Sequence, residues 1–248
     1  MISSDYRTRF LTFALLTLVA FACRAQVPGS GSPTGINAVF MKLFGSATAF
    51  EASANVRVLD PSGKENMTMP MDFAALDHKV RVRIDMNQMK SADTTDIDML
   101  KKLGIARMSS LIRPDKKLIY LVYPDQKSYF SMPMSAEDAA ETSNPKLQKT
   151  PVGNEAIEGH DCVKNKIVVT DEKGQTMEAT TWNAKDLNDF PVQIQAKEKD
   201  TTSIVRFKNV KFGKVDPREF EPPADYAHYN DASEMIQAII KKSGGAAK

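Results

Sequence analysis

The chain has 248 residues, with 33 basic and 31 acidic side chains and a formal net charge of +2. This length suits a single all-β domain. A net charge so close to zero creates no long-range field that would attract nucleic acid or anionic lipid, so no nucleic-acid partner is expected.

An export signal is predicted at residues 1–25. Arg7 and Arg9 form its basic start, and a mainly apolar run follows at residues 10–22. This run has the length of a signal h-region and is short for a helix that spans a bilayer. Cleavage removes three arginines and one aspartate, which lowers the net charge from +2 to 0. A periplasmic or secreted protein is therefore expected, and an uncleaved membrane anchor is the alternative.

Cys23 leaves a second kind of processing open. It follows the apolar run, as the lipidated first residue of a bacterial lipoprotein does, but Ala20 stands where such signals usually carry leucine. If cleavage instead falls after Ala25, Cys162 is the only cysteine of the mature chain, so no intrachain disulfide can form. Soluble export is the main prediction, and a lipid anchor on Cys23 is the alternative.

A leader and a helix are expected next. Residues 26–35 are rich in glycine, serine and proline, which is typical of a flexible segment. Apolar residues then recur at helical spacing from Ile36 to Phe44, and Gly45 ends this helix. So short a helix needs a surface to lie on, and the strands that follow can supply it.

Three strands are predicted within residues 50–86. Apolar and polar residues alternate there with a period of two, and turns at Asp60-Pro61-Ser62-Gly63 and Asp77-His78 separate the strands. One apolar and one polar face indicate an antiparallel sheet covered on one side only. The apolar positions of the second and third strands are Met67, Met69, Met71, Phe73, Val80, Val82, Ile84 and Met86.

The alternation stops at residues 91–103. Ile97, Leu100 and Leu103 predict a short helix there, which ends at Gly104. Strands with Pro-Asp turns between them follow. They are expected at residues 106–112, 118–123 and 128–132.

A polar stretch at residues 133–151 is expected to be a surface loop with one helical turn at 136–141. Residues 155–196 then show the pattern of an antiparallel meander: strand, tight turn, strand, short excursion, strand. A further strand is predicted at residues 201–212.

The chain closes with an extended segment and a helix. Three prolines and four acidic residues occupy residues 215–226. Asp231 and Glu234 form a capping box for a last helix. The whole pattern predicts a mainly β (α+β) fold with about ten short strands, two or three helices and no second domain.

Several segments, in this order, resemble the LolA/LolB-like lipoprotein-carrier superfamily, and most closely an uncharacterised periplasmic domain of unknown function within it. The resemblance covers about Phe50 to Tyr226. The segments that carry it are Lys79–Met86, the run Leu118–Tyr129 with its Pro124-Asp125-Gln126-Lys127 turn, Gly159-His160-Asp161-Cys162, Trp182 followed by Phe190-Pro191-Val192, and Phe220-Glu221-Pro222-Pro223.

The resemblance implies a strongly curved antiparallel sheet, an unclosed half-barrel, whose concave apolar face is covered by helices and can hold acyl chains. Together with the residue patterns above, this predicts a signal at 1–25, a leader at 26–35, a half-barrel domain at 36–230, and a C-terminal helix with its tail at 231–248. The resemblance does not explain the C-terminal helix.

Methionines mark the candidate ligand surface. Twelve of the thirteen follow the predicted signal. Flexible, polarizable side chains suit a surface that adapts to variable apolar ligands, and ordinary core filling is the alternative. The candidate cavity is lined by Met67, Met69, Met71, Phe73, Val82, Ile84, Met86, Tyr120, Val122 and Met177.

Candidate catalytic and metal-binding residues are few. Cys162 and His160 could form a nucleophile and its base, but no third orienting group is evident, so a buried cysteine that packs as a small hydrophobe is preferred. His78 and His228 lack the spacing of a zinc site and are expected at the surface. Trp182 is expected to anchor packing at the rim of the sheet.

Asp93, Asp96 and Asp98 lack the glycine and the terminal glutamate of a calcium loop, and helix capping explains them better. No catalytic residue, cofactor or metal is expected. The prediction is a monomeric, exported, non-catalytic carrier or binding protein for an apolar or lipidic ligand, with an envelope protein as a further partner. The alternative is a structural or interaction module of the envelope that binds no ligand.

Overall fold

The computed structural model describes residues 41, 43–91, 95–134, 146–170, 176–198 and 201–244. The predicted export signal, the leader, six of the nine residues of the first predicted helix, Asp93 and the helical turn after residue 133 lie outside these residues. The predicted last helix is described, and residues 245–248 of the predicted tail are not.

Strands dominate the described chain. They are β1 (Ala49–Leu59), β2 (Glu65–Leu76), β3 (Lys79–Asp85), β4 (Lys90–Ser91), β5 (Arg107–Arg113), β6 (Leu118–Tyr123), β7 (Ser128–Pro133), β8 (Lys146–Ile157), β9 (His160–Thr170), β10 (Thr176–Ala184), β11 (Phe190–Glu198), β12 (Thr201–Phe212) and β13 (Ala227–Tyr229). The α-helices are α3 (Thr95–Lys102) and α5 (Ala232–Gly244), and short 3-10 turns are η1 (Met86–Gln88), η2 (Pro114–Lys116), η3 (Pro124–Gln126), η4 (Lys185–Leu187) and η5 (Pro217–Phe220).

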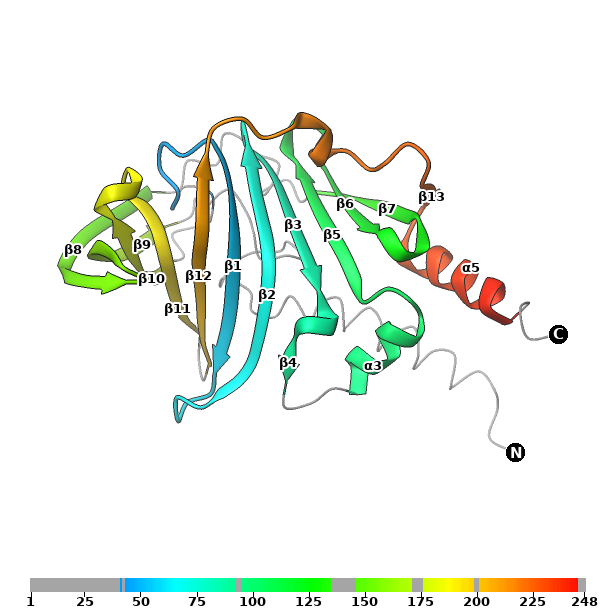
Figure 1. The fold of residues 1–248 in the computed structure, drawn as a ribbon, viewed down its shortest axis with the longest axis horizontal. Helices are drawn as coiled ribbons and strands as arrows, with labels where there is room; N and C mark the ends of the chain where they lie inside the picture. The colour runs from blue at the N-terminus through cyan, green and yellow to red at the C-terminus, as the bar shows by residue number, and fades with distance from the viewer. Residues whose placement is uncertain are drawn as a thin grey trace.

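All of these strands form one sheet, in the order β13-β7-β6-β5-β3-β2-β1-β12-β11-β10-β9-β8, with β4 paired to β2. Neighbouring strands are antiparallel except β13 and β7, which are parallel. The sheet is strongly curved and its edges, β13 and β8, do not pair, so it is an unclosed half-barrel (Figure 1). The predicted fold class is confirmed, with thirteen strands in place of about ten.

Local turn chemistry sets the hairpins. Asp60 accepts hydrogen bonds at Oδ1 from the backbone N–H groups of Ser62 (2.9 Å) and Lys64 (3.0 Å), which closes the β1–β2 turn. The two Pro-Asp turns end in left-handed residues, Lys117 and Lys127, with φ of 55° and 44°. Each of these lysines donates its N–H to the carbonyl of the proline three residues earlier, so the two hairpins repeat one design.

One face of the sheet carries most of the hydrophobic core. The main core cluster reaches from Ile167 on β9 to Phe130 on β7, strands that lie near opposite edges. The helices add Ile97 from α3, and Met235 and Ile239 from α5. Because side chains converge on the concave side of a curved sheet, we call this the inner face. No helix of the described residues is long and apolar enough to cross a membrane.

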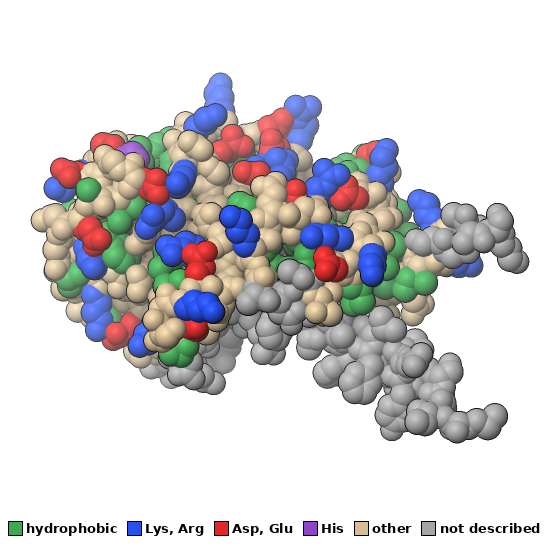
Figure 2. Space-filling view, turned by 60° about the horizontal axis from the view of Figure 1, so that its bottom comes forward, with side chains coloured by type: hydrophobic (Ala, Val, Ile, Leu, Met, Phe, Trp, Pro, Cys, Tyr) green, Lys and Arg blue, Asp and Glu red, His purple; other side chains and the backbone are tan. Residues whose placement is uncertain are grey.

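The outer face is covered in part, whereas the alternation predicted cover on one side only. After β12 the chain crosses this face and reaches β13 at the far edge (Figure 1). We call residues 215–226 the closing segment. Val215 and Phe220 of this segment form a second small core with Ala74 of β2. Elsewhere basic and acidic side chains are mixed over the surface, as Figure 2 shows for one side of the molecule.

Part of the polar stretch that was predicted to be a loop is strand, and residues 135–145 of it lie outside the described residues. Residues 146–151 belong to β8, an edge strand that was not predicted. Eleven of its twelve residues are exposed or half-buried, and only Ile157 is buried. A strand that is wet on both faces shows no alternation, so the pattern could not reveal it.

The last helix begins as predicted. Asp231 accepts a hydrogen bond from the backbone N–H of Glu234 (2.8 Å), and Glu234 in turn accepts one from the N–H of Asn230 (2.8 Å). The first bond satisfies an N–H group that the first helical turn leaves free, and the second ties the residue before Asp231 to the helix. They place Met235 and Ile239 on the core, beside β7 and β13.

Candidate functional site

Four methionines gather at one end of the inner face. Met71 lies opposite Ile84, which lies opposite Met108, in a row across β2, β3 and β5. Met69 and Met86 flank this row, and both are 2% exposed. We call Met69, Met71, Met86 and Met108 the methionine cluster. The short helix α3 covers this end, and two more methionines, Met89 and Met99, pack there against the core.

At the other end of the inner face, away from the methionine cluster, the central strands carry aromatic side chains. Five rings, which we call the phenylalanine cluster, pack so that each has at least three of the others within 6 Å, with Phe50–Phe190 centroids 4.9 Å apart and Phe44–Phe50 centroids 5.0 Å apart. Rings have few rotamers and prefer defined contacts, so this end is stiff. The cluster consists of Phe44, Phe50, Phe73, Phe190 and Phe207.

The structure brings six of the ten predicted site residues together on the inner face. Five are buried in the core, and Met71 is partly buried and packs against it. The six are Met69, Met71, Phe73, Val82, Ile84 and Met86.

The other four are placed differently. Met67 is half-buried near the start of β2. Tyr120 and Val122 belong to the outer face, because they alternate with Leu121, which lies in the inner core. The backbone of Met177 pairs with Val169 on β9, and its side chain lies outside the described residues.

Cys162 is a core residue in this structure. It is 1% exposed, and its thiol donates to the backbone carbonyl of His160 at 3.3 Å. Burial raises the pKa of the Cys162 thiol, which disfavours the reactive thiolate. His160 does have an acidic partner that the sequence did not reveal, because its Nδ1 lies 2.7 Å from a carboxylate oxygen of Asp186. That pair is at the surface, and the thiol bonds to a carbonyl instead of the ring.

Trp182 is held from two sides. It is 4% exposed, its Nε1–H donates to the carboxylate of Glu155 at 2.8 Å, and Lys164 Nζ lies 4.9 Å from the ring centroid. The hydrogen bond from Trp182 is the main reason that the pKa of Glu155 is lowered. This environment fits the expected packing role.

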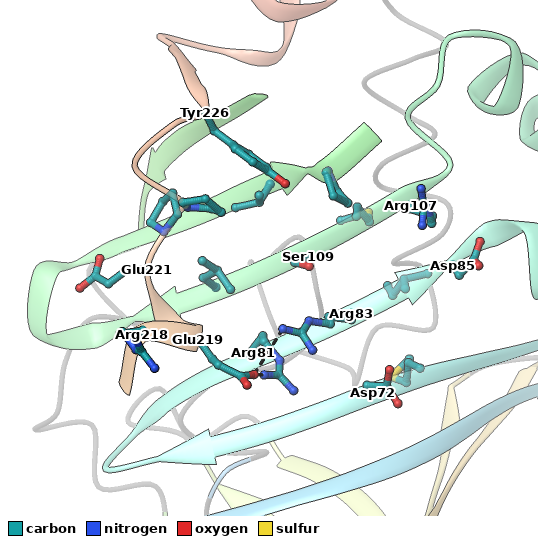
Figure 3. A pocket seen from close by; sticks show the side chains of 18 of the residues that line it. Asp72, Arg81, Arg83, Asp85, Arg107, Ser109, Arg218, Glu219, Glu221 and Tyr226 are labelled. Atoms are coloured by element: carbon teal, nitrogen blue, oxygen red, sulfur yellow. Dashed lines mark hydrogen bonds and ion pairs between the residues drawn. The ribbon is translucent and has the colours of Figure 1, made fainter. Parts of the chain in front are cut away.

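A groove of about 1120 Å³ crosses the outer face, between the sheet and the closing segment (Figure 3). Leu111 and Val122 line it from the sheet, and Pro222, Pro223 and Tyr226 line it from the closing segment. Four arginines and five carboxylates also line it.

Arg81 is the most constrained side chain of this groove. It is 3% exposed and contacts the carboxylate of Glu219, which also lies 3.3 Å from Arg83. Glu51 is 3.7 Å from Arg81 on its other side. Burial and then the like charge of Arg83 lower the pKa of Arg81 to about 10. Figure 3 shows Arg81 and Glu219 meeting at one side of the groove.

The charges of the groove are largely balanced within it. Arg218 pairs with Asp216 at 2.6 Å, and Arg81 and Arg83 share Glu219. Balanced charges give the groove no preference for a single anion or cation. The ion pairs that line the groove mainly attach the closing segment to the sheet. The apolar residues Val215 and Phe220 in an otherwise polar segment were the sequence signal for this contact.

Comparisons with known proteins give a family and a fold. Residues 63–190 match the family described as "Domain of unknown function (DUF4412)". No curated protein matches the chain.

Three solved structures are among those similar to this chain. A LolA superfamily protein from Nitrosomonas europaea is 11% identical, with a TM-score of 0.40 over 75% of this chain and 98% of that one. The lipoprotein LppX from Mycobacterium tuberculosis is 12% identical, with a TM-score of 0.39 over 68% and 90%. LprF from Mycobacterium bovis is 12% identical, with a TM-score of 0.37 over 75% and 96%. As the sequence predicted, the chain is similar to a solved protein of the LolA superfamily.

Proposed function

The chain belongs to the DUF4412 family, and we propose that it is an exported, non-catalytic carrier or binding protein for an apolar, lipidic ligand. The ligand lies on the inner face of the half-barrel, at the end that holds the methionine cluster. The chain acts in the periplasm or outside the cell, as a monomer. The signal-like residues 1–25 support the export part of this proposal.

The observation that carries the proposal is the concentration of methionine in one core. Ten of the twelve methionines that follow the predicted signal lie in the inner core or pack against it. They are Met41, Met69, Met71, Met86, Met89, Met99, Met108, Met132, Met134 and Met235.

Methionine side chains explain how such a core could receive a ligand. Interiors are close-packed, so a bound chain must displace side chains or a covering helix. Methionine has three rotatable bonds and no branch, so its side chain can repack around lipid chains of different length. The branched side chains of leucine and isoleucine would keep one conformation. The stiff phenylalanine cluster then forms the end of the inner face that does not repack. The short helix α3, with only eight residues, covers the opposite end, where the methionine cluster can repack.

A leucine replacement of the methionine cluster tests this role. The variant changes Met69, Met71, Met86 and Met108 to leucine, which keeps volume and apolarity, so the protein should still fold. We expect the wild type to take up a fluorescent long-chain fatty acid and the variant to bind it about tenfold more weakly. Titration followed by fluorescence measures the affinity, and thermal melting checks the fold.

The control variant changes Met132 and Met134, which pack against the same core from β7 and the residue after it, to leucine. It should bind the probe like the wild type. Equal affinity in the four-leucine variant would reduce the methionines to core filling. A wild type that takes up no probe would support the second candidate, a ligand-free envelope module, which the dense packing of the phenylalanine cluster favours.

A further inference from the structure

Two buried serines of the inner face hold hydroxyl groups without a hydrogen-bond partner. Ser110 is 0% exposed and Ser128 is 2% exposed, and neither Oγ is paired within the described chain. Ser110 lies in register between Val82 of β3 and Leu121 of β6. Ser128 lies opposite Tyr123. Both hydroxyls therefore project into the apolar core.

Elsewhere the core satisfies its polar groups. Asn165 donates to the side-chain oxygen of Asn183 at 3.0 Å, and Thr181 donates to the same atom at 2.7 Å. Asn183 in turn donates to the carbonyl of Asp189 at 2.7 Å. The unpaired serines are thus an exception within their own core, and unpaired buried groups call for an explanation.

The need for a small side chain does not explain them. The inner face uses alanine at other small positions, such as Ala54, Ala75 and Ala179, all of them buried. Alanine at positions 110 and 128 would fill nearly the same space and avoid the free-energy cost of a buried hydroxyl without a partner. The hydroxyl itself must therefore serve a purpose that the ligand-free protein does not show.

We propose that Ser110 and Ser128 donate hydrogen bonds to neutral carbonyl oxygens, ester or amide, of the bound lipid. This inference rests on the proposed function and names the chemistry that the site selects. A charged group would need a counter-charge, and the inner-face positions of the described strands β3, β5, β6 and β7 carry none. These positions are Val80, Val82, Ile84, Met108, Ser110, Ile112, Ile119, Leu121, Tyr123, Ser128, Phe130 and Met132.

The spacing of the two serines adds a second requirement. β5 and β7 are separated by β6, and Ser128 lies two residues along β7 from Phe130, the position in line with Ser110, so the two hydroxyls are roughly 12 Å apart. One carbonyl oxygen cannot bond to both. The site therefore fits a lipid with at least two ester or amide carbonyls, such as a diacyl lipid, better than a single free fatty acid.

A pair of probes that differ only in their carbonyls tests the inference. One is a pyrene-labelled diacylglycerol with ester links, and the other is its dialkyl analogue with ether links. The full-length wild type should bind the ester form about tenfold more tightly, which is the effect of roughly two neutral hydrogen bonds. The double variant Ser110→Ala/Ser128→Ala should bind both probes equally, at the affinity of the ether form.

The matched control is Ser109→Ala/Ser131→Ala, which changes the outward-facing serines of the same two strands. It should keep the ester preference. Without ligand, the inner-face double variant should melt at the same or a higher temperature, since it loses only unpaired hydroxyls. A clearly lower melting temperature would assign the serines a structural role and overturn the inference.

The remaining outcomes separate the two proposals. Equal binding of ester and ether forms by the wild type overturns the role of the serines and leaves the carrier function standing. An ester preference that survives in the inner-face double variant also overturns it. Binding of neither probe by the wild type rejects the carrier function, and with it the inference.

Discussion

On the outer face of the sheet, the stability of the fold depends on how the buried charge of Arg81 is balanced. Its guanidinium is almost fully buried, where its charge is poorly solvated, and burial is the main reason that its pKa is lowered to about 10. Glu219 supplies the nearby opposite charge. A buried charge that loses its partner is far more costly than an exposed one, so the two residues stabilise the fold only together.

Glu219→Gln should therefore destabilise the protein. Because Glu219 is itself about one-third exposed, we expect a loss of about 2 kcal/mol, below the range for fully buried pairs. Urea denaturation measures the free energy of unfolding. The control is Glu65→Gln, which removes the exposed partner of Arg57 and should change little. Equal effects of the two substitutions would contradict the account of Arg81.

At the scale of elements, the acidic side chains of the closing segment hold it to the sheet. Its Glu219, Glu221 and Asp225 face basic residues of the sheet and its turns. The pairs are Glu219 with Arg81 and Arg83, Glu221 with Arg113 and Lys116, and Asp225 with Lys127. Because this segment leads to β13 and α5, these ion pairs also position the helix that covers one side of the core.

Acid should loosen this attachment. Burial opposes ionisation of Glu221, but hydrogen bonds from Lys116 and Arg113 outweigh it and lower its pKa below the ordinary value of 4.5. A carboxylate with a lowered folded-state pKa contributes stability above its unfolded pKa and loses that contribution as the pH falls through the folded one. The melting temperature of the wild type should fall below about pH 4.5.

Glu221→Gln should lower the melting temperature at pH 7 and flatten its decline toward pH 3. Thermal melts across this range measure both effects. An unchanged decline in the variant would mean that other carboxylates account for the acid sensitivity.

The helix α5 offers a test with neighbouring residues. Ile239 is 5% exposed and lies in the core, whereas Ile240 is 53% exposed. Ile239→Ala should cost about 3 kcal/mol of unfolding free energy, because it opens a cavity. Ile240→Ala should stay within about 0.5 kcal/mol. Denaturation of the two variants side by side compares them, and similar losses would mean that α5 does not seat on the core as described.

For the whole molecule, the alternation of β1 to β3 was enough to predict an antiparallel sheet with one apolar face, because a period of two directly separates the faces of a strand. The curvature into a half-barrel was expected only from the family resemblance, because strand periodicity does not encode the shape of a sheet. The strand β8 was not predicted, because the side chains on both of its faces contact solvent and the sequence therefore shows no alternation there. Tyr120 and Val122 were assigned to the ligand surface, but the register of β6 puts them on the outer face. Arg81 and the groove depend on a contact between β3 and residues more than 130 positions away, which local patterns do not encode.

The central claim is that the inner face holds a lipid in the cell. Native mass spectrometry of the mature protein, purified without denaturation or detergent from its own cells, tests this most directly. The account predicts a cleaved N-terminus and, beside the protein mass, adducts that collisional activation releases as lipids with at least two acyl chains. A spectrum that contains only the unliganded polypeptide, from several gentle preparations, would contradict it.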